Sequence, residues 1–235
     1  MQVVILAGGM GTRIKSVAGN LPKILLPVAG RPFLEHQLEL LAKHGLRDVV
    51  YCVGYGGDQV EQLAGDGSRY GFTLRYAQED PACLMGTGGA LLNALPLLQS
   101  SFLVLYGDSY LPTDYRRLVH AFQAGGRRAM MSVFKNEGQW DKSNVRIADG
   151  RVVFYSKSAG PGEADYIDYG LSAFRKEVIE SYRSAALPLD MARIQQDLVN
   201  RGEMAAYEVK ERFYEIGKPE GLNELSEWLS RKGRG

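Results

Sequence analysis

Near the start of the chain, three glycines and an arginine share one eight-residue string, Leu6-Ala7-Gly8-Gly9-Met10-Gly11-Thr12-Arg13. Glycine lets the backbone approach a ligand closely, so successive N–H groups can point at phosphate oxygens, and Arg13 adds a charged donor. The string is neither a Walker loop, which continues with Gly-Lys-Ser or Gly-Lys-Thr, nor a dinucleotide-binding fingerprint, which needs a further glycine. We interpret it as a phosphate cradle; an ordinary glycine-rich turn is the alternative.

A lysine and an aspartate carry the charges that a site for phosphates and a metal ion requires. Lys23 follows Pro22, ten residues after Arg13, and Asp108 ends the apolar string from Phe102 to Gly107. Ligands bind at the carboxyl ends of strands in an open parallel sheet, and Mg²⁺ commonly takes one or two carboxylates together with phosphate oxygens. Asp108 is therefore our first candidate metal ligand. Taken singly, Lys23 also fits a solvated surface charge, and Asp108 a turn or cap residue.

The elements that must position these side chains follow from the hydrophobic pattern. Short apolar runs alternate with longer amphipathic stretches through the first half, which predicts strands at 3–7, 48–53, 72–77 and 102–106 and helices at 33–44 and 87–98. In the second half, Asp149-Gly150 marks a hairpin, and Pro219 with apolar residues at helical spacing predicts a closing helix over 219–229. We expect an α/β fold with a Rossmann-like, mostly parallel mixed sheet and helices on both faces.

Composition restricts the kinds of partner. The chain has 235 residues, which suits one domain over 1–235, and its net charge of +1 gives no reason to expect a nucleic-acid track or a membrane-surface patch. The two cysteines, Cys52 and Cys83, lack the paired spacing of a zinc or redox site. The apolar run at the N-terminus is too short for a signal peptide, and no run is long enough for a membrane span. We expect a cytoplasmic protein that binds neither nucleic acid nor membrane.

Taken together, the glycine string, the Pro22-Lys23 pair and the segment Pro27-Val28-Ala29-Gly30-Arg31-Pro32 resemble the nucleoside-diphosphate-sugar pyrophosphorylases. That family begins L-A-G-G-x-G-T-R, followed by P-K and a proline-bounded P-x-x-G-x-P. The resemblance implies a nucleotide-diphospho-sugar transferase fold, with a nucleotide-binding half at 1–110 and a sugar-phosphate-binding half at 111–235. It also implies catalytic roles for Arg13, Lys23 and Asp108, and nucleotide binding by Leu6, Ala7, Gly8, Gly9, Gly11, Thr12 and Arg13.

The base is expected beside Gly86-Thr87-Gly88-Gly89-Ala90, which follows a strand and precedes an apolar helix. Small residues there let a flat base approach, and free N–H groups at a helix start face a ligand. The resemblance places a G-T-G/A segment along the base and ribose, with an acidic or amide residue upstream such as Gln78 or Glu79. We assign Gln78, Gly86, Thr87 and Gly88 to the nucleotide; a simple N-cap at Thr87 is the alternative.

The sugar phosphate and the second metal ligand are assigned by resemblance, with departures from the family pattern. Glu215 stands where the family usually has the aspartate of D-I-G-x-P, so the metal ligands are Asp108 and Glu215. Lys157 matches the lysine of E-K-P, although the glutamate and proline are missing. Asp168 replaces the asparagine of I-N-x-G, where Gly170 supplies the glycine, and an ionised aspartate only accepts hydrogen bonds. Asn144 is a further candidate hydroxyl partner, or an ordinary turn residue.

The reaction implied is Mg²⁺-dependent transfer of a nucleoside monophosphate from an NTP to a sugar 1-phosphate, releasing pyrophosphate. Among short relatives, the pattern is most similar to heptose or mannose 1-phosphate guanylyltransferases, with N-acetylmuramate 1-phosphate uridylyltransferases as the alternative. Two other hypotheses stay open: a cytidylyltransferase for a phosphate such as phosphocholine, which an aromatic cage of Trp140, Tyr155, Tyr166 and Tyr169 would suit, and a non-catalytic nucleotide-sugar sensor. We expect a monomer or a small homo-oligomer.

Overall fold

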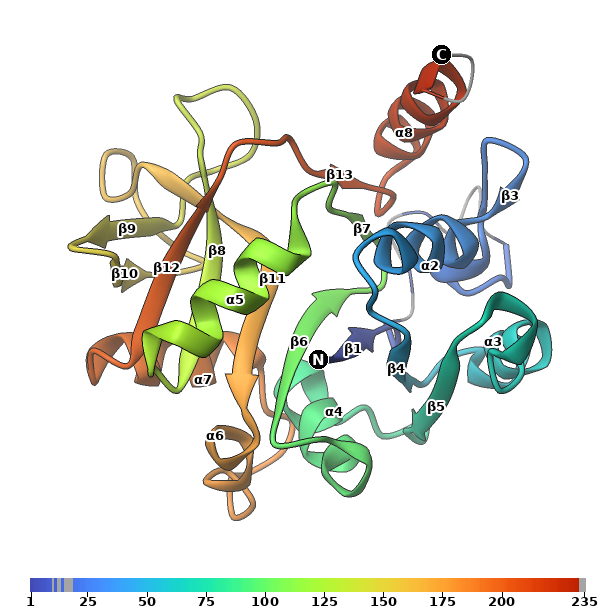
Figure 1. Cartoon of the computed structure of the whole chain (residues 1–235), viewed down its shortest axis with the longest axis horizontal. Coiled ribbons are helices and arrows are strands. Elements are labelled where there is room, and N and C mark those ends of the chain that lie inside the picture. Colours follow the sequence, from blue (N-terminus) through green and yellow to red (C-terminus); the bar gives the residue numbers. More distant parts are fainter. Residues whose placement is uncertain (10, 12–13, 15–18, 233–235) are drawn as a thin grey trace.

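A nine-stranded mixed sheet runs through the computed structural model, which describes residues 1–9, 11, 14 and 19–232 (Figure 1). Its strand order is β5-β4-β1-β6-β11-β8-β12-β10-β9. The strands are β1 Gln2–Leu6, β4 Asp48–Val53, β5 Thr73–Gln78, β6 Ser101–Tyr106, β8 Ala129–Lys135, β9 Val145–Ala148, β10 Arg151–Tyr155, β11 Tyr166–Arg175 and β12 Met204–Val209. Two short ladders stand beside it, β2 Pro27–Val28 with β3 Arg31–Pro32 and β7 Ser109–Tyr110 with β13 Tyr214–Glu215.

The first four strands in that order are parallel, as the alternating pattern predicts. β1 lies between β4 and β6, with Val4 opposite Val50 on one side and Val104 on the other. All five residues of β1 are buried, because a central parallel strand is covered on both faces. The carboxyl ends of β1, β4, β5 and β6 therefore lie along one edge of the sheet.

The other half of the sheet is mixed. β11 runs antiparallel to both β6 and β8, whereas β12 is parallel to β8. The predicted hairpin joins β9 and β10, and Asp149 and Gly150 both have positive φ, 50° and 68°, as a primed hairpin turn requires. The predicted α/β fold is thus confirmed, with its parallel first half and its antiparallel addition.

Helices cover both faces of the sheet. Alternate residues of β1 face opposite sides: Val3 and Ile5 belong to the cluster that contains α2, α5 and α8 residues, and Val4 and Leu6 to the cluster that contains α4, α6 and α7 residues. The helices are α2 Phe33–Lys43, α3 Gly57–Ala64, α4 Gly86–Ala94, α5 Tyr115–Gly125, α6 Lys176–Glu180, α7 Met191–Asn200 and α8 Pro219–Lys232. Short 3₁₀ turns are η2 Lys23–Leu25, η3 Ser68–Tyr70 and η4 Leu95–Leu97.

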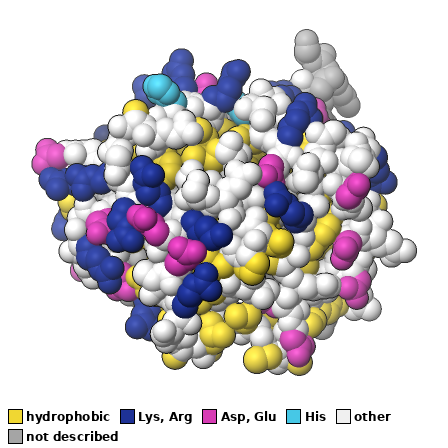
Figure 2. All heavy atoms as spheres, turned by 60° about the horizontal axis from the view of Figure 1, so that its bottom comes forward, with side chains coloured by type: hydrophobic (Ala, Val, Ile, Leu, Met, Phe, Trp, Pro, Cys, Tyr) yellow, Lys and Arg dark blue, Asp and Glu magenta, His cyan; other side chains and the backbone are white. Residues whose placement is uncertain are grey.

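Charges of both signs are interspersed on one face of the molecule (Figure 2). On the face shown in Figure 2, Lys and Arg side chains lie among Asp and Glu side chains and small apolar areas. This pattern agrees with nearly equal numbers of basic and acidic residues, 28 and 27. Within the described ranges, no helix is both long and apolar enough to cross a membrane.

Candidate active site

A cavity of about 220 Å³ lies where the parallel strands end. Its walls come from the segments that follow β1, β5 and β6, from β4, and from the start of α4. The lining residues are Leu6, Ala7, Gly8, Gly9, Lys23, Ile24, Cys52, Glu79, Leu84, Gly86, Thr87, Ala90, Tyr106, Gly107 and Asp108. Ligands bind at this edge in open α/β sheets, so the cavity is where the sequence places the site.

The glycine loop closes one wall of this cavity. Ala7 N donates to Cys52 O at 2.8 Å, and Gly107 N donates to Leu6 O at 2.9 Å, so the start of the loop is held between β4 and β6. Gly11 has a φ of 62°, in the region that favours glycine. A Cβ atom there would lie 3.2 Å from Lys23 Cγ, which places the loop directly beside the lysine. Thr12 and Arg13, which the sequence assigns to the nucleotide, lie outside the described residues.

Lys23 and Asp108 form an ion pair in the cavity wall. Lys23 Nζ lies 2.6 Å from Asp108 Oδ2, and only 19% and 23% of the two side chains are exposed. Lys23 begins η2 directly after Pro22, whose fixed φ sets the turn, and Asp108 follows Gly107 at the end of β6. The structure thus brings together two of the three predicted catalytic residues.

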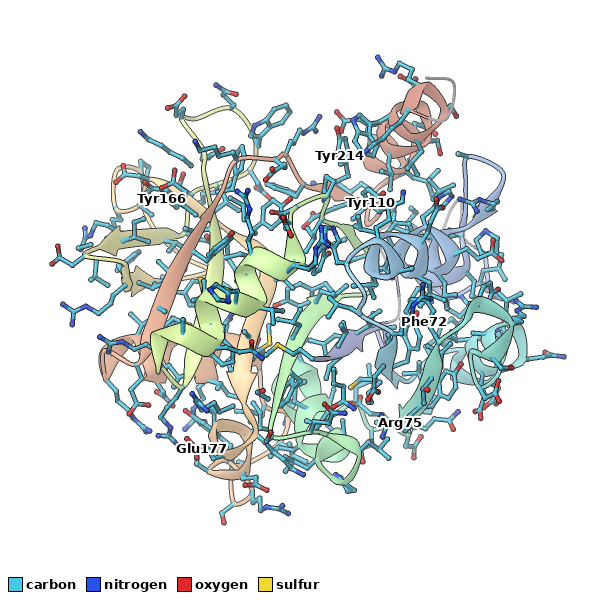
Figure 3. All side chains as sticks on the ribbon, viewed as in Figure 1. Phe72, Arg75, Tyr110, Tyr166, Glu177 and Tyr214 are labelled. Carbon is cyan, nitrogen blue, oxygen red and sulfur yellow. The ribbon has the colours of Figure 1, made fainter. Side chains whose placement is uncertain are left out.

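Glu215 reaches Asp108 through the backbone of the small β7–β13 ladder. Glu215 pairs with Ser109, and Ile216 N donates to Asp108 O at 2.9 Å. Figure 3 labels Tyr110 and Tyr214, the neighbouring pair of this ladder. The Glu215 residue is exposed and lines a separate hollow of about 330 Å³ together with Trp140 and Arg212.

These carboxylates fit a magnesium ion by their chemistry. Asp108 and Glu215 supply hard oxygen donors, which Mg²⁺ prefers, from two chain segments joined by a hydrogen bond. Within the described residues, no group of three or more His, Cys, Asp or Glu side chains is arranged to hold a metal by itself. Mg²⁺ completes its shell with substrate phosphates and water, so one or two carboxylates suffice. The backbones of Asp108 and Glu215 are adjacent, and the two residues line different cavities.

At the other end of the cavity stands Glu79, not Gln78. Gln78 Nε2 donates to Asp58 Oδ1 at 2.6 Å on the surface, and its side chain is not part of the lining. Glu79 is buried; its Oε2 accepts a long hydrogen bond from Met85 N at 3.5 Å, and its Oε1 has no partner among the described residues. Burial raises the pKa of Glu79. Of the two residues named for this position, Glu79 therefore lines the cavity, and Gln78, to which the nucleotide was assigned, does not.

The start of α4 differs from expectation. Gly86 and Thr87 line the cavity, but Gly88 N and Gly89 N donate to Leu189 O at 2.8 and 3.1 Å. These two N–H groups are thus satisfied by the second half of the chain and are not free for a ligand, and Gly88 is not part of the lining. The contact spans about a hundred residues, so no local pattern announces it.

The predicted sugar-phosphate residues gather next to this cavity. Asn144 Oδ1 accepts from Asp168 N at 2.8 Å, and Asp168 Oδ1 accepts from Gly170 N at 3.0 Å. Burial raises the pKa of Asp168, although Gly170 N, Gln195 and Lys157 oppose the shift. Lys157 Nζ contacts Asp190, a residue that sequence analysis did not single out.

Tyr106 joins the two parts of the site. It lines the cavity, and burial together with Asp168, Tyr155, Asp190 and Asp108 raises its pKa well above the usual range. Carboxylates from both halves of the chain therefore lie close enough to the Tyr106 hydroxyl group to oppose its ionisation. The residues that the sequence assigns to the metal ion and to the sugar phosphate, Asp108 and Asp168, thus lie near the same tyrosine.

Two of the aromatic residues proposed for a cation cage, Trp140 and Tyr169, make other contacts. The guanidinium of Arg212 lies 3.7 Å from the centre of the Trp140 ring, and the Tyr169 ring is buried against Phe134 and Phe213. A cage for a quaternary ammonium needs open ring faces around one point. Trp140 and Tyr169 do not offer them.

Comparison with known proteins agrees with this geometry. The family model described as nucleotidyl transferase matches residues 2–232. The chain belongs to the nucleotidyl transferase family. Members of this family are therefore the proteins with which this chain is compared.

Two sequence relatives are named for sugar 1-phosphates. The D-glycero-alpha-D-manno-heptose 1-phosphate guanylyltransferase of Campylobacter jejuni is 35% identical over 118 residues, which cover 50% of this chain and 52% of that protein. The N-acetylmuramate alpha-1-phosphate uridylyltransferase of Neisseria meningitidis is 39% identical over 116 residues, covering 49% of this chain and 50% of that protein. Each match spans about half of the relative's length.

A solved structure extends the likeness over nearly the whole chain. HddC from Yersinia pseudotuberculosis is 27% identical, with a TM-score of 0.79, and the match covers 97% of this chain and 99% of that one. The same protein is also known in complex with GMP-PN. This chain therefore shares the fold of HddC over nearly its whole length.

Proposed function

We propose that this protein transfers GMP from GTP to a heptose or mannose 1-phosphate, giving a GDP-sugar and pyrophosphate. The observation that carries the proposal is the meeting of Lys23 and Asp108 in a cavity between the glycine loop and the start of α4. A cation and a metal-binding carboxylate at one cavity wall suit a triphosphate.

The chemistry requires no general base. An oxygen of the sugar 1-phosphate, already an anion, forms a bond to the α-phosphorus of GTP. The bond from that phosphorus to the oxygen shared with the β-phosphate breaks, and pyrophosphate leaves with the electron pair. The main obstacle is bringing two anions together, which positioning and fixed positive charge overcome.

The residues divide this work between them. Backbone N–H groups at Gly8 and Gly9, with Arg13, hold the triphosphate, and Lys23 neutralises the reacting phosphates. Asp108 and Glu215 would hold Mg²⁺, which supplies charge neutralisation at the phosphate oxygens when bound.

Glu79 supports guanine as the base. Glu79 lines the cavity together with the apolar residues Leu84 and Ala90, and its buried Oε1 has no hydrogen-bond partner in the described part of the chain. An ionised carboxylate only accepts hydrogen bonds, and guanine offers two adjacent donors, the ring N1–H and the amino group. Uracil offers one donor between two carbonyl oxygens, which would face the carboxylate unfavourably. The relatives named as a guanylyltransferase and as a GMP-PN complex agree with this choice.

Asp168 and Asn144 support a sugar rich in hydroxyl groups. Asp168 Oδ2 is 3.4 Å from Gln195 Nε2, and the second carboxylate oxygen already accepts from Gly170 N. An acceptor at this position binds a donating hydroxyl group. The alternative, UTP with N-acetylmuramate 1-phosphate, rests on the Neisseria relative.

A substrate panel tests the proposal. The protein and Mg²⁺ are incubated with GTP, UTP, CTP, dTTP or ATP against heptose, mannose, glucose and N-acetylmuramate 1-phosphates, and pyrophosphate is followed. We expect GTP with the heptose or mannose 1-phosphate to give the highest kcat/KM. A preference for UTP with N-acetylmuramate 1-phosphate would show that the proposed base and sugar are wrong and that the proposed reaction type is right. Pyrophosphate from no combination would refute the proposal.

A further inference from the structure

Asp190 touches both halves of the proposed site. It stands directly before α7, and its Oδ1 accepts from Thr87 Oγ1 at 3.1 Å. On the other side, Lys157 Nζ lies 2.9 Å from Oδ1 and 2.6 Å from Oδ2. Thr87 lines the nucleotide cavity, and Lys157 follows β10 in the second half of the chain. One carboxylate therefore connects the nucleotide wall to the phosphate-binding lysine.

The carboxylate of Asp190 is itself firmly placed. Leu189 N donates to Met85 O at 2.8 Å, Gly88 N donates back to Leu189 O at 2.8 Å, and Met191 N donates to Thr87 Oγ1 at 2.9 Å. Asp190 Oδ1 also accepts from Ala192 N at 2.9 Å and so caps α7. Burial opposes ionisation, but hydrogen bonds from Lys157 and Ala192 N outweigh it and lower the pKa of Asp190. The group is an anion fixed to the start of α4.

Lys157 depends on such a partner for its position. More than half of its side chain is exposed, 54%, and a lysine has four rotatable bonds and a compact charge that water solvates strongly. Without Asp190 the ammonium group would sample many positions around the mouth of the site. With Asp190, two of its three N–H donors are directed at fixed oxygens, and the third remains for a phosphate.

We infer that Asp190 is a positioning residue that holds the Lys157 ammonium group beside Thr87, so that a sugar phosphate bound by Lys157 lies next to the nucleotide. The inference rests on the proposed function, in which Lys157 binds the sugar phosphate. It assigns Asp190 no contact with substrate. Its whole effect on the sugar phosphate passes through Lys157.

A double-mutant cycle isolates that effect. Asp190→Asn keeps an N-cap for α7 and an acceptor for Thr87 but removes the charge that holds Lys157. We expect Asp190→Asn to lower kcat/KM for the sugar 1-phosphate about 10-fold, mainly through KM, with KM for GTP unchanged, because a displaced ammonium group binds the phosphate poorly. In the Lys157→Ala background, Asp190→Asn should change neither value further. Calorimetric Kd values for mannose 1-phosphate give the same comparison without turnover.

Asp114→Asn is the matched control. Asp114 caps α5 in the same way, accepting from Arg116 N and Arg117 N, but lies outside the lining of the cavity. Asp114→Asn should lower the stability of the protein by no more than Asp190→Asn does, and its kinetics should be those of the wild type. Equal losses from Asp190→Asn with and without Lys157 would show a purely structural cap and overturn the inference. A lower KM in Asp190→Asn would overturn it too, because the carboxylate would then be a competitor of the phosphate.

The outcomes separate this inference from the proposed function. If Lys157→Ala weakens sugar-phosphate binding and Asp190→Asn does not, only the inference fails. If Lys157→Ala leaves KM and Kd unchanged, the assignment of Lys157 in the proposed function fails, and the inference falls with it.

Discussion

Lys23 Nζ lies 2.6 Å from Asp108 Oδ2, although 85 residues separate the two in the sequence. The contact joins the turn after the glycine loop to the end of β6. Each group neutralises the other in the cavity wall. In the proposed function, a triphosphate with its metal ion would exchange this contact for two new ones, phosphate to Lys23 and metal to Asp108.

Asp108→Asn should lower kcat by about 100-fold or more, because the amide keeps the shape of the carboxylate but loses the charge that holds a divalent ion. Pyrophosphate release under saturating substrates measures it. Asp149→Asn is the control, since Asp149 lies in the β9–β10 turn at a φ of 50°, which asparagine tolerates. Wild-type turnover in Asp108→Asn would show that the carboxylate does not hold the metal.

Lys23→Met should also lower kcat about 100-fold, because the variant keeps much of the apolar contact with Gly11 while losing the positive charge beside the phosphates. The comparison is Lys43→Met on α2, where the lysine is 58% exposed and pairs with Glu39. Neither residue of that pair lines the cavity, so the control should keep its kinetics. If both variants turn over alike, Lys23 has no role at the phosphates.

Glu79 should make GTP binding depend on pH. Guanine donates to the ionised carboxylate, so binding favours the anion, while burial raises the pKa of Glu79 in the free protein above its ordinary 4.5. As the pH falls from neutrality toward 4.5, Glu79 takes up a proton, and KM for GTP should rise. Initial rates at several pH values, with KM for the sugar 1-phosphate followed in parallel, provide the measurement.

Glu79→Gln tests the same carboxylate by substitution. The amide offers one donor and one acceptor, so discrimination for GTP over UTP should fall roughly 10- to 100-fold, and the pH dependence of KM for GTP should disappear. The variant should also melt higher than the wild type at neutral pH. Because burial makes the pKa of Glu79 higher in the folded than in the unfolded state, the folded protein loses stability as the pH rises through that pKa. Glutamine carries no charge, so the variant does not lose this stability. Unchanged base preference would show that Glu79 does not read the base.

Gly221→Ala should displace Glu215, the second candidate ligand of the metal ion. A Cβ atom at this position of α8 would clash with Glu215 O, so the backbone of β13 must move. Overpacking of this kind costs about 1–3 kcal/mol, and we expect a lower Tm together with a reduced kcat. Gly125→Ala, near the end of α5, is the control, because nothing lies within 4 Å of its added Cβ. Unaltered Tm and kcat in Gly221→Ala would show that Glu215 is not held by this contact.

The parallel half of the fold is readable from the sequence because its signals are local. Apolar runs such as Val3 to Leu6 must be strands buried on both faces, and the alternation with amphipathic stretches leaves few topologies. Asp149-Gly150 likewise specifies its own turn. The position of Asp108 at a strand end follows from the same pattern, and Lys23 Nζ lies 2.6 Å from its carboxylate.

Contacts between segments that lie far apart in the sequence were harder to predict from it. The choice between Gln78 and Glu79 depends on which side of the strand end faces the cavity, and a one-residue change of register reverses it. Leu189, which takes two N–H groups of α4, and Asp190, which meets Lys157, come from a segment with no motif of its own. Their roles arise only when the second half of the chain packs against the first.

The most direct test of the account follows both phosphorus products of one reaction. With GTP, Mg²⁺ and heptose or mannose 1-phosphate, ³¹P NMR should show the GDP-sugar and pyrophosphate growing in equal amounts, and neither forming when the sugar 1-phosphate is left out. Pyrophosphate released from GTP alone, or GDP and inorganic phosphate in place of the two products, would contradict a site that holds the two anions side by side and joins them directly.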